Sequence, residues 1–223
     1  MKKPTFYEQM GIIIPGAVLL FGLLFFFPAL RDLLAKDGIT VGQLGIYVLL
    51  SYAAGNLVAA LGNVGESVLW PLAGGMPTNW VVKPNTGLIS PQQRELVEKK
   101  LHARLHIQIE TIRGLDRKVW WPISRQLYAD VARHGKRDRI DTFNGNYGLN
   151  RGLASSCIIL ACVAAVQQRW WPCVLLIALT VVYGYRAYRF GVHYGRELYM
   201  QFLTISSDTA PRSGSKKRSV DNK

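Results

Sequence analysis

Long runs without a charged residue constrain the fold of this chain more than any other feature. The first run lies between Glu8 and Arg31 and has 22 residues, and the second lies between Asp37 and Glu66 and has 28. About 20 consecutive apolar residues are needed to cross a hydrocarbon core of roughly 30 Å. Both runs reach this length, so they predict two membrane-spanning helices.

The first run predicts a span from Gln9 to Leu30. A secretory signal peptide is the alternative, because Lys2 and Lys3 give the chain a basic start. The apolar core of a signal peptide has about 7–15 residues, and a cleavage site of small residues follows it. This run is longer and no such site follows Pro28, so we interpret it as a span.

Two shorter uncharged runs follow later in the chain. One has 17 residues between Arg151 and Arg169, and the other has 16 between Arg169 and Arg186. Each is short for a span, but together they predict a helical hairpin that turns at Arg169. Trp170 and Trp171 at this turn are typical of a lipid–water boundary. The predicted fold class is therefore an all-α membrane protein with four transmembrane helices and a cytoplasmic helical module between helices 2 and 3.

The basic residues predict the topology. The chain has 27 Lys and Arg residues against 14 Asp and Glu, a net charge of +13. All the basic residues except Arg31, Lys36 and Arg169 lie on one side if both ends and the middle segment share a compartment. Cytoplasmic loops carry the excess of Lys and Arg. We therefore predict a multi-pass protein of the bacterial inner membrane with both termini inside the cell.

This topology divides the chain into five segments. We expect an N-terminal transmembrane pair (1–82), a basic cytoplasmic helical segment (83–150), a C-terminal transmembrane hairpin (151–187), a juxtamembrane amphipathic helix (188–205) and a disordered tail (206–223).

Helix signals place two helices in the cytoplasmic segment. Ser90 is a typical N-cap and Gln93 completes a capping box, so the first helix begins there and is expected to run to about Ile112. The second is expected to follow Pro122 and to end at Gly135.

The second span carries a pattern of small residues. Ser51, Gly55 and Ala59 recur every four residues, and this spacing lets two helix backbones approach closely in lipid. Asn56 and Asn63 are amides at membrane depth and need partners in protein or in a wet cavity. Two interpretations remain open: a packing face within one chain, and a face that lines a pore or meets other copies.

A polar stripe is expected on the first cytoplasmic helix. Glu98, His102, His106 and Glu110 recur every four residues, so they would share one helix face. Two His at this spacing can bind one metal ion together with a carboxylate. The HExxH protease pattern is absent, because Ala103 follows His102. We favour a solvated stripe over a metal site or a pH-sensitive contact, and we expect no metal and no cofactor.

Glycines cluster where the third span begins. Gly145, Gly148 and Gly152 lie within residues 143–154, next to Arg151. The lysine and hydroxyl residue of a Walker phosphate loop are missing. We expect a flexible elbow that leads into the membrane, with a ligand-responsive hinge as the alternative.

Basic residues continue past the fourth span. Arg186, Arg189, His193 and Arg196 are spaced as one helix face, and aromatic residues alternate with them. This pattern suits anionic lipid headgroups and also single-stranded nucleic acid. The basic candidates for binding a phosphate-rich ligand are Arg151, Arg186, Arg189 and Arg196.

The function predicted from these features is an oligomeric inner-membrane channel or membrane-perturbing effector, gated by its basic cytoplasmic helices. Four spans are too few for a pore within one chain, so a closed ring of copies is expected. One alternative is a non-transporting anchor or scaffold for a cytoplasmic partner protein. A membrane enzyme is the second alternative, and no catalytic signature supports it. The expected partners are the lipid bilayer, further copies of the chain and a phosphate-rich ligand or partner protein.

The layout resembles a known class of proteins. The short cytoplasmic start, the paired spans and the basic module between Lys83 and Arg151 are similar to small membrane effectors of bacterial anti-phage defence, including the Hailong transmembrane effectors. In some of those systems an oligonucleotide made by a partner nucleotidyltransferase controls an oligomeric channel. The resemblance covers the whole chain in layout and charge and assigns no residue. It implies that the basic vestibule binds a phosphate-rich regulator and that opening depolarises the cell.

Overall fold

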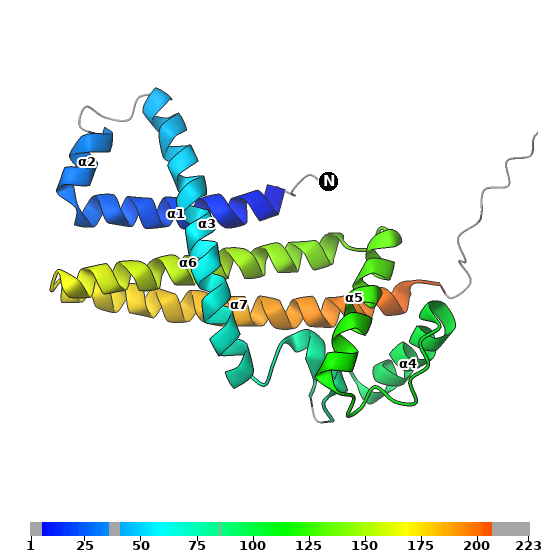
Figure 1. The fold of residues 1–223 in the computed structure, drawn as a ribbon. Helices are drawn as coiled ribbons and strands as arrows, with labels where there is room; N and C mark the ends of the chain where they lie inside the picture. Colours follow the sequence, from blue (N-terminus) through cyan, green and yellow to red (C-terminus); the bar gives the residue numbers. More distant parts are fainter. Residues whose placement is uncertain (1–5, 36–40, 85, 207–223) are drawn as a thin grey trace, which may run out of the picture.

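The computed structural model describes residues 6–35, 41–84 and 86–206, and all the regular structure in these ranges is helical (Figure 1). The elements are α1 (Phe6–Phe26), α2 (Pro28–Ala35), α3 (Val41–Leu72), the 3-10 helix η1 (Pro77–Val82), α4 (Pro91–Leu105), α5 (Arg117–Arg133), α6 (Asp138–Val166) and α7 (Trp170–Thr204). The tail expected to be disordered lies, except for residue 206, outside the described residues.

Four of these helices, α1, α3, α6 and α7, are long and apolar enough to cross a membrane. The predicted all-helical fold with four long apolar helices is therefore confirmed. In Figure 1, α6 and α7 form a hairpin, α1 lies along it, and α3 crosses the other three. The actual crossing of a bilayer and its direction stay predictions.

Helices α1 and α6 run in the same direction, as their contacts show. The Ser156 hydroxyl donates to the Pro15 carbonyl oxygen at 2.9 Å, and the Gln167 amide donates to the Phe26 carbonyl oxygen at 3.1 Å. A Cβ on Gly152 would lie 2.7 Å from the Pro15 ring. The absence of a side chain at Gly152 therefore allows α1 to lie close against α6.

Helices α1 and α3 cross with their backbones in contact. A Cβ built on Gly16 would overlap the carbonyl oxygen of Ser51, and one built on Gly55 would overlap that of Ile12. The Tyr47 hydroxyl donates to the Ala17 carbonyl oxygen at 2.8 Å. Ser51 and Gly55 therefore pack within one chain, which was the first of the two interpretations of the small-residue pattern.

A buried hydrophobic core, separate from the contacts between the long apolar helices, lies around the C-terminal half of α7. The buried side chains of this core come from η1, α4, α5, the start of α6 and α7, and they include Val81, Val97, Trp120, Leu127, Ile140, Tyr199 and Phe202. The Trp120 indole N–H donates to the Thr78 carbonyl oxygen at 2.9 Å and fixes η1 against α5. We call this part, residues 77–84, 86–140 and 188–205, the module. Helix α7 is continuous from Trp170 to Thr204, so the expected juxtamembrane helix is its last part.

Helix α4 begins as predicted but ends early. The Ser90 side chain accepts from the Gln93 N–H, and the reciprocal bond completes the capping box. The helix ends at Leu105, because His106 adopts a left-handed conformation with φ 53°. The chain then turns back and buries Ile112, so the predicted extension to Ile112 is wrong.

Two further boundary predictions are wrong. Helix α5 begins at Arg117, capped by Asp116, and Pro122 lies inside it. Residues 143–154 form part of the uninterrupted helix α6 and not an elbow. Asn146 and Asn150 donate to carbonyl oxygens four residues earlier, so these turn-favouring side chains bond to their own helix.

Candidate functional site

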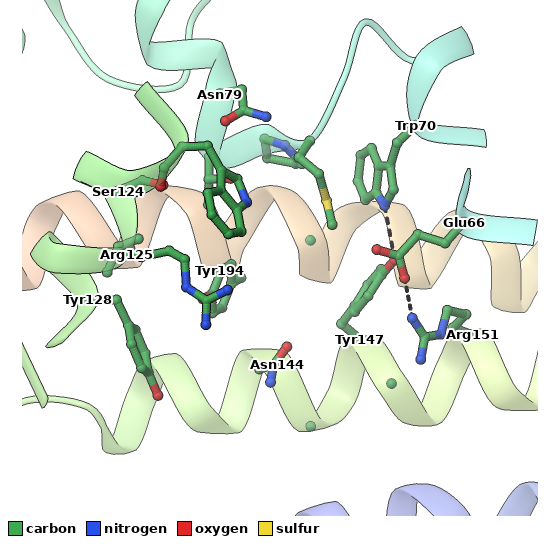
Figure 2. A pocket seen from close by; sticks show the side chains of 18 of the residues that line it. Glu66, Trp70, Asn79, Ser124, Arg125, Tyr128, Asn144, Tyr147, Arg151 and Tyr194 are labelled. Carbon is green, nitrogen blue, oxygen red and sulfur yellow. Dashed lines mark hydrogen bonds and ion pairs between the residues drawn. The ribbon is translucent and has the colours of Figure 1, made fainter. Parts of the chain in front are cut away.

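A cavity of about 1010 Å³ lies where the module meets the long apolar helices. We call it the junction cavity (Figure 2). One wall is a single face of α5, because the residues that line it are spaced at helical intervals: Arg117, Trp121, Ser124, Arg125 and Tyr128. The other walls come from α1, α3, η1, α6 and α7.

The α6 wall of the junction cavity owes its space to glycines. Gly145 and Gly148 both line the cavity, and a Cβ added at Gly148 would meet no atom within 4 Å. The glycines expected to form an elbow therefore leave room beside a straight helix. Asn144 lines the same wall, and Figure 2 shows it below the Arg125 guanidinium.

Helix α3 joins α6 at one end of the junction cavity. Glu66 forms an ion pair with Arg151, and the Trp70 indole N–H donates to the Tyr147 hydroxyl at 3.0 Å. The Arg151 guanidinium also lies 5.4 Å from the centre of the Tyr147 ring. These contacts tie the last turns of α3 to the beginning of the apolar half of α6 (Figure 2).

The α5 wall of the junction cavity carries two arginine side chains. The Arg125 guanidinium lies 4.9 Å from the centre of the Trp121 ring. Within the described residues, no ion pair joins Arg117 or Arg125 to a carboxylate. Burial raises the pKa of the Tyr194 phenol, which also lines the cavity. The cavity is therefore basic and partly aromatic.

The four basic residues predicted to bind a ligand do not all line this cavity. Arg151 does, and its main partner is Glu66. Arg196 donates to the Leu88 carbonyl oxygen at 3.2 Å and lines a second, smaller hollow. Arg186 lies over the Phe190 ring, and Arg189 is exposed.

The expectation that Glu98, His102, His106 and Glu110 share one helix face is wrong. Because α4 ends at Leu105, His106 and Glu110 leave that face. Glu98 instead accepts the Ile112 N–H at 2.6 Å and so stabilises the returning chain. In the described ranges, no three His, Cys, Asp or Glu side chains lie close enough together to hold a metal ion.

Helix α3 has one face that packs on the rest of the chain, and its exposed side divides into a polar and an aliphatic sector. Ser51 and Gly55 are buried and Ala59 lines the junction cavity, whereas Asn56 and Asn63 are exposed. At 100° per residue, four exposed polar side chains fall within a sector of about 60°. We call these residues the polar stripe: Tyr52, Asn56, Asn63 and Ser67. The adjacent sector is aliphatic and also exposed: Leu57, Leu61, Val64 and Val68.

The predictions from sequence missed part of the polar stripe and part of the wall of the junction cavity. Tyr52 and Ser67 extend the amide pattern by one helical turn on each side, and this spacing was visible in the sequence. The basic and aromatic face of α5 was hidden, because the helix was expected to begin after Pro122.

A comparison of this chain with family models, curated proteins and solved structures found no match in any of the three.

Proposed function

We propose that this chain forms an oligomeric channel in the inner membrane, with a pore lined by the polar stripe of α3. The observation that carries this proposal is the exposure of Asn56 and Asn63 on a long and mostly apolar helix. Amide side chains in contact with lipid are unfavourable, so such residues face protein or water. The Asn56 amide donates to the Tyr52 carbonyl oxygen of its own helix at 2.8 Å, but the described residues leave both amides exposed, so we expect further copies to enclose them around water.

The geometry of α3 supports a pore. Its three faces differ: one packs on α1 and α6, one is aliphatic and suits lipid, and one is the polar stripe. The helix has 32 residues and is about 48 Å long, enough to cross a bilayer completely. Copies arranged in a closed ring would bring their polar stripes together around one axis.

The contacts of α3 also support control by the module. Glu66 and Trp70 bond to α6 at the junction cavity, and the chain continues from α3 into η1 of the module. A displacement of the module would therefore act on the helix that lines the pore. With both termini inside the cell, the module faces the cytoplasm and reads a cytoplasmic signal. The layout shared with anti-phage effectors suggests that opening serves to depolarise an infected cell.

Ion flux from liposomes tests the channel. The purified full chain, reconstituted in vesicles, should release chloride or a small dye. Asn56→Leu combined with Asn63→Leu should reduce the flux at least about tenfold, because apolar side chains favour dewetting of a pore. Leu57→Ala, on the aliphatic face, is the matched control and should leave the flux unchanged. Sealed vesicles that contain correctly inserted protein would overturn the proposal and favour the non-transporting anchor.

Thiol accessibility tests the pore face independently of flux. In a Cys162→Ala background, Asn63→Cys should react with a charged, membrane-impermeant thiol reagent, whereas Leu61→Cys should not. Both positions are exposed in one chain, so the structure of a single copy cannot produce this difference. Equal reaction at both positions would contradict a pore lined by the polar stripe.

A further inference from the structure

We propose that a second hollow, lined by three arginine side chains in the module, binds a soluble ligand that carries phosphate groups. We call it the arginine hollow, and its volume is about 570 Å³. Arg94 reaches it from α4, Arg113 from the chain that follows α4, and Arg196 from α7. This inference goes beyond the proposed pore, because ligand binding is measured without ion flux.

The chain around the hollow holds the three guanidinium groups in place. Each donates one hydrogen bond to a backbone carbonyl oxygen in the connection between η1 and α4. The bonds join Arg94 Nη2 to Lys83 at 3.3 Å, Arg113 Nη2 to Pro84 at 3.4 Å and Arg196 Nε to Leu88 at 3.2 Å. Each guanidinium has five N–H donors, so most of them remain for a ligand.

The described residues do not balance the charge of the arginine hollow. In the described residues, no ion pair joins Arg94, Arg113 or Arg196 to a carboxylate. Arg94 is only 7% exposed, and its Nε is buried without a hydrogen-bond partner in the described structure. A buried positive charge is costly unless an anion compensates it. The N-terminus of α4 begins beside the hollow, at Ser90, and adds a partial positive charge.

Phosphate is the anion that this arrangement suits. The guanidinium fork matches the geometry of phosphate oxygens and can bind them with two parallel hydrogen bonds. Arg196 lies ten residues beyond Arg186, where the last apolar run ends, which is about 15 Å along a helix. The headgroup layer is roughly 5–8 Å thick on each side of the bilayer. The hollow therefore lies beyond the lipid headgroups and is open to a soluble ligand.

Calorimetric titration with inorganic pyrophosphate tests the proposal. The full chain is used in nanodiscs of phosphatidylcholine, which carry no net charge. Wild-type protein should bind pyrophosphate, and Arg113→Gln and Arg196→Gln should each weaken binding at least about tenfold, because each removes charge-assisted hydrogen bonds. Arg189→Gln is the matched control: it lies on the same helix as Arg196, is exposed and removes the same charge.

A steric variant tests the hollow without changing its charge. Gly87 lines the hollow, and a Cβ at this position would meet no atom within 4 Å. Gly87→Leu should therefore leave the unfolding midpoint within about 2 °C of wild type, because the added side chain enters open space. The same variant should abolish the binding of pyrophosphate.

Each outcome of these titrations decides the proposal. Binding that is lost in Arg196→Gln and kept in Arg189→Gln supports the arginine hollow, even if vesicles show no ion flux. Absence of pyrophosphate binding to folded wild-type protein overturns it, as does an equal loss in Arg189→Gln. If Arg196→Gln instead loses binding only to nanodiscs that contain phosphatidylglycerol, the ligand is a lipid headgroup and the soluble assignment is wrong.

Discussion

Glu66 of α3 forms an ion pair with Arg151 of α6, although 85 residues separate them in the chain. Their side chains are 17% and 23% exposed, so water screens the pair only partly. The pair stands at the wall of the junction cavity, next to the hydrogen bond between Trp70 and Tyr147. It therefore fixes the end of the proposed pore helix to the helix that leads from the module.

Replacing one partner of this pair should destabilise the fold more than the pairwise replacement of both would suggest. Glu66→Gln leaves Arg151 without its anion and should lower the free energy of unfolding by about 1–3 kcal/mol. The double variant Glu66→Leu, Arg151→Met removes both charges and should be less destabilised than the sum of its single variants. Thermal unfolding in detergent measures this coupling. Additive effects would show that the two side chains do not interact in the folded protein.

The crossing of α1 and α3 should not tolerate a side chain. Gly55→Ala places a methyl group against the Ile12 carbonyl oxygen, and overpacking of this kind costs about 1–3 kcal/mol. Gly65→Ala in the same helix is the control, because a Cβ there would meet no atom within 4 Å. Thermal unfolding of the two variants in detergent checks this. A Gly55→Ala protein as stable as Gly65→Ala would contradict the close contact.

The proposed pore should change its ion preference when a charge is placed on the polar stripe. Asn63→Asp adds a ring of carboxylates if copies surround a pore, and such rings favour cations. The reversal potential across a salt gradient should therefore shift towards that of the cation. Asn63→Gln keeps the amide and is expected to leave the reversal potential unchanged. An identical potential in the Asp variant and in wild type would place Asn63 away from the conduction path.

The stability of the module should depend strongly on one buried ion pair and only weakly on an exposed one. Arg104 Nε lies 3.1 Å from Asp130 Oδ2, and these side chains are 6% and 8% exposed. Arg104→Ala leaves the buried Asp130 carboxylate with His134 as its remaining ion-pair partner in the described residues, at 3.5 Å, and should destabilise the module by about 1–3 kcal/mol. Arg139 is paired with Glu197 but is 70% exposed, so Arg139→Ala should cost less than about 1 kcal/mol. Hydrogen exchange of the amides in α5 measures both effects, and equal protection in the two variants would refute the difference.

The all-helical architecture and its four long apolar helices follow from patterns along the chain. A charge-free run of about 20 residues and a capping box each lie within one helix, so they can be recognised in the sequence without knowledge of the fold. The run before Glu66 lies in α3, and Ser90 caps α4 as predicted. The run before Arg31 was predicted as one span to Leu30, but α1 ends at Phe26 and Pro28 begins α2. The one-sided distribution of Lys and Arg can also be recognised in the sequence, and the topology that it indicates stays a prediction.

Two errors in the prediction involve contact between distant parts of the chain, whereas the start of α5 was misplaced because its local cap at Asp116 was overlooked. Helix α4 ends before His106 because the returning segment buries Ile112 and bonds it to Glu98. The glycine segment lies inside α6, and α1 packs closely against it, as the contact of Gly152 with Pro15 shows. Neither partner lies within a few residues of the position that it changes.

The two ligand-sized hollows arise in the same way. Arg94, Arg113 and Arg196 come from three separate parts of the chain, and no spacing along the sequence relates them. Patterns in the sequence report what a helix needs locally, such as an apolar length or a cap. Which charges meet, and which remain without a partner, depends on how the helices pack, because packing alone brings distant side chains within bonding distance.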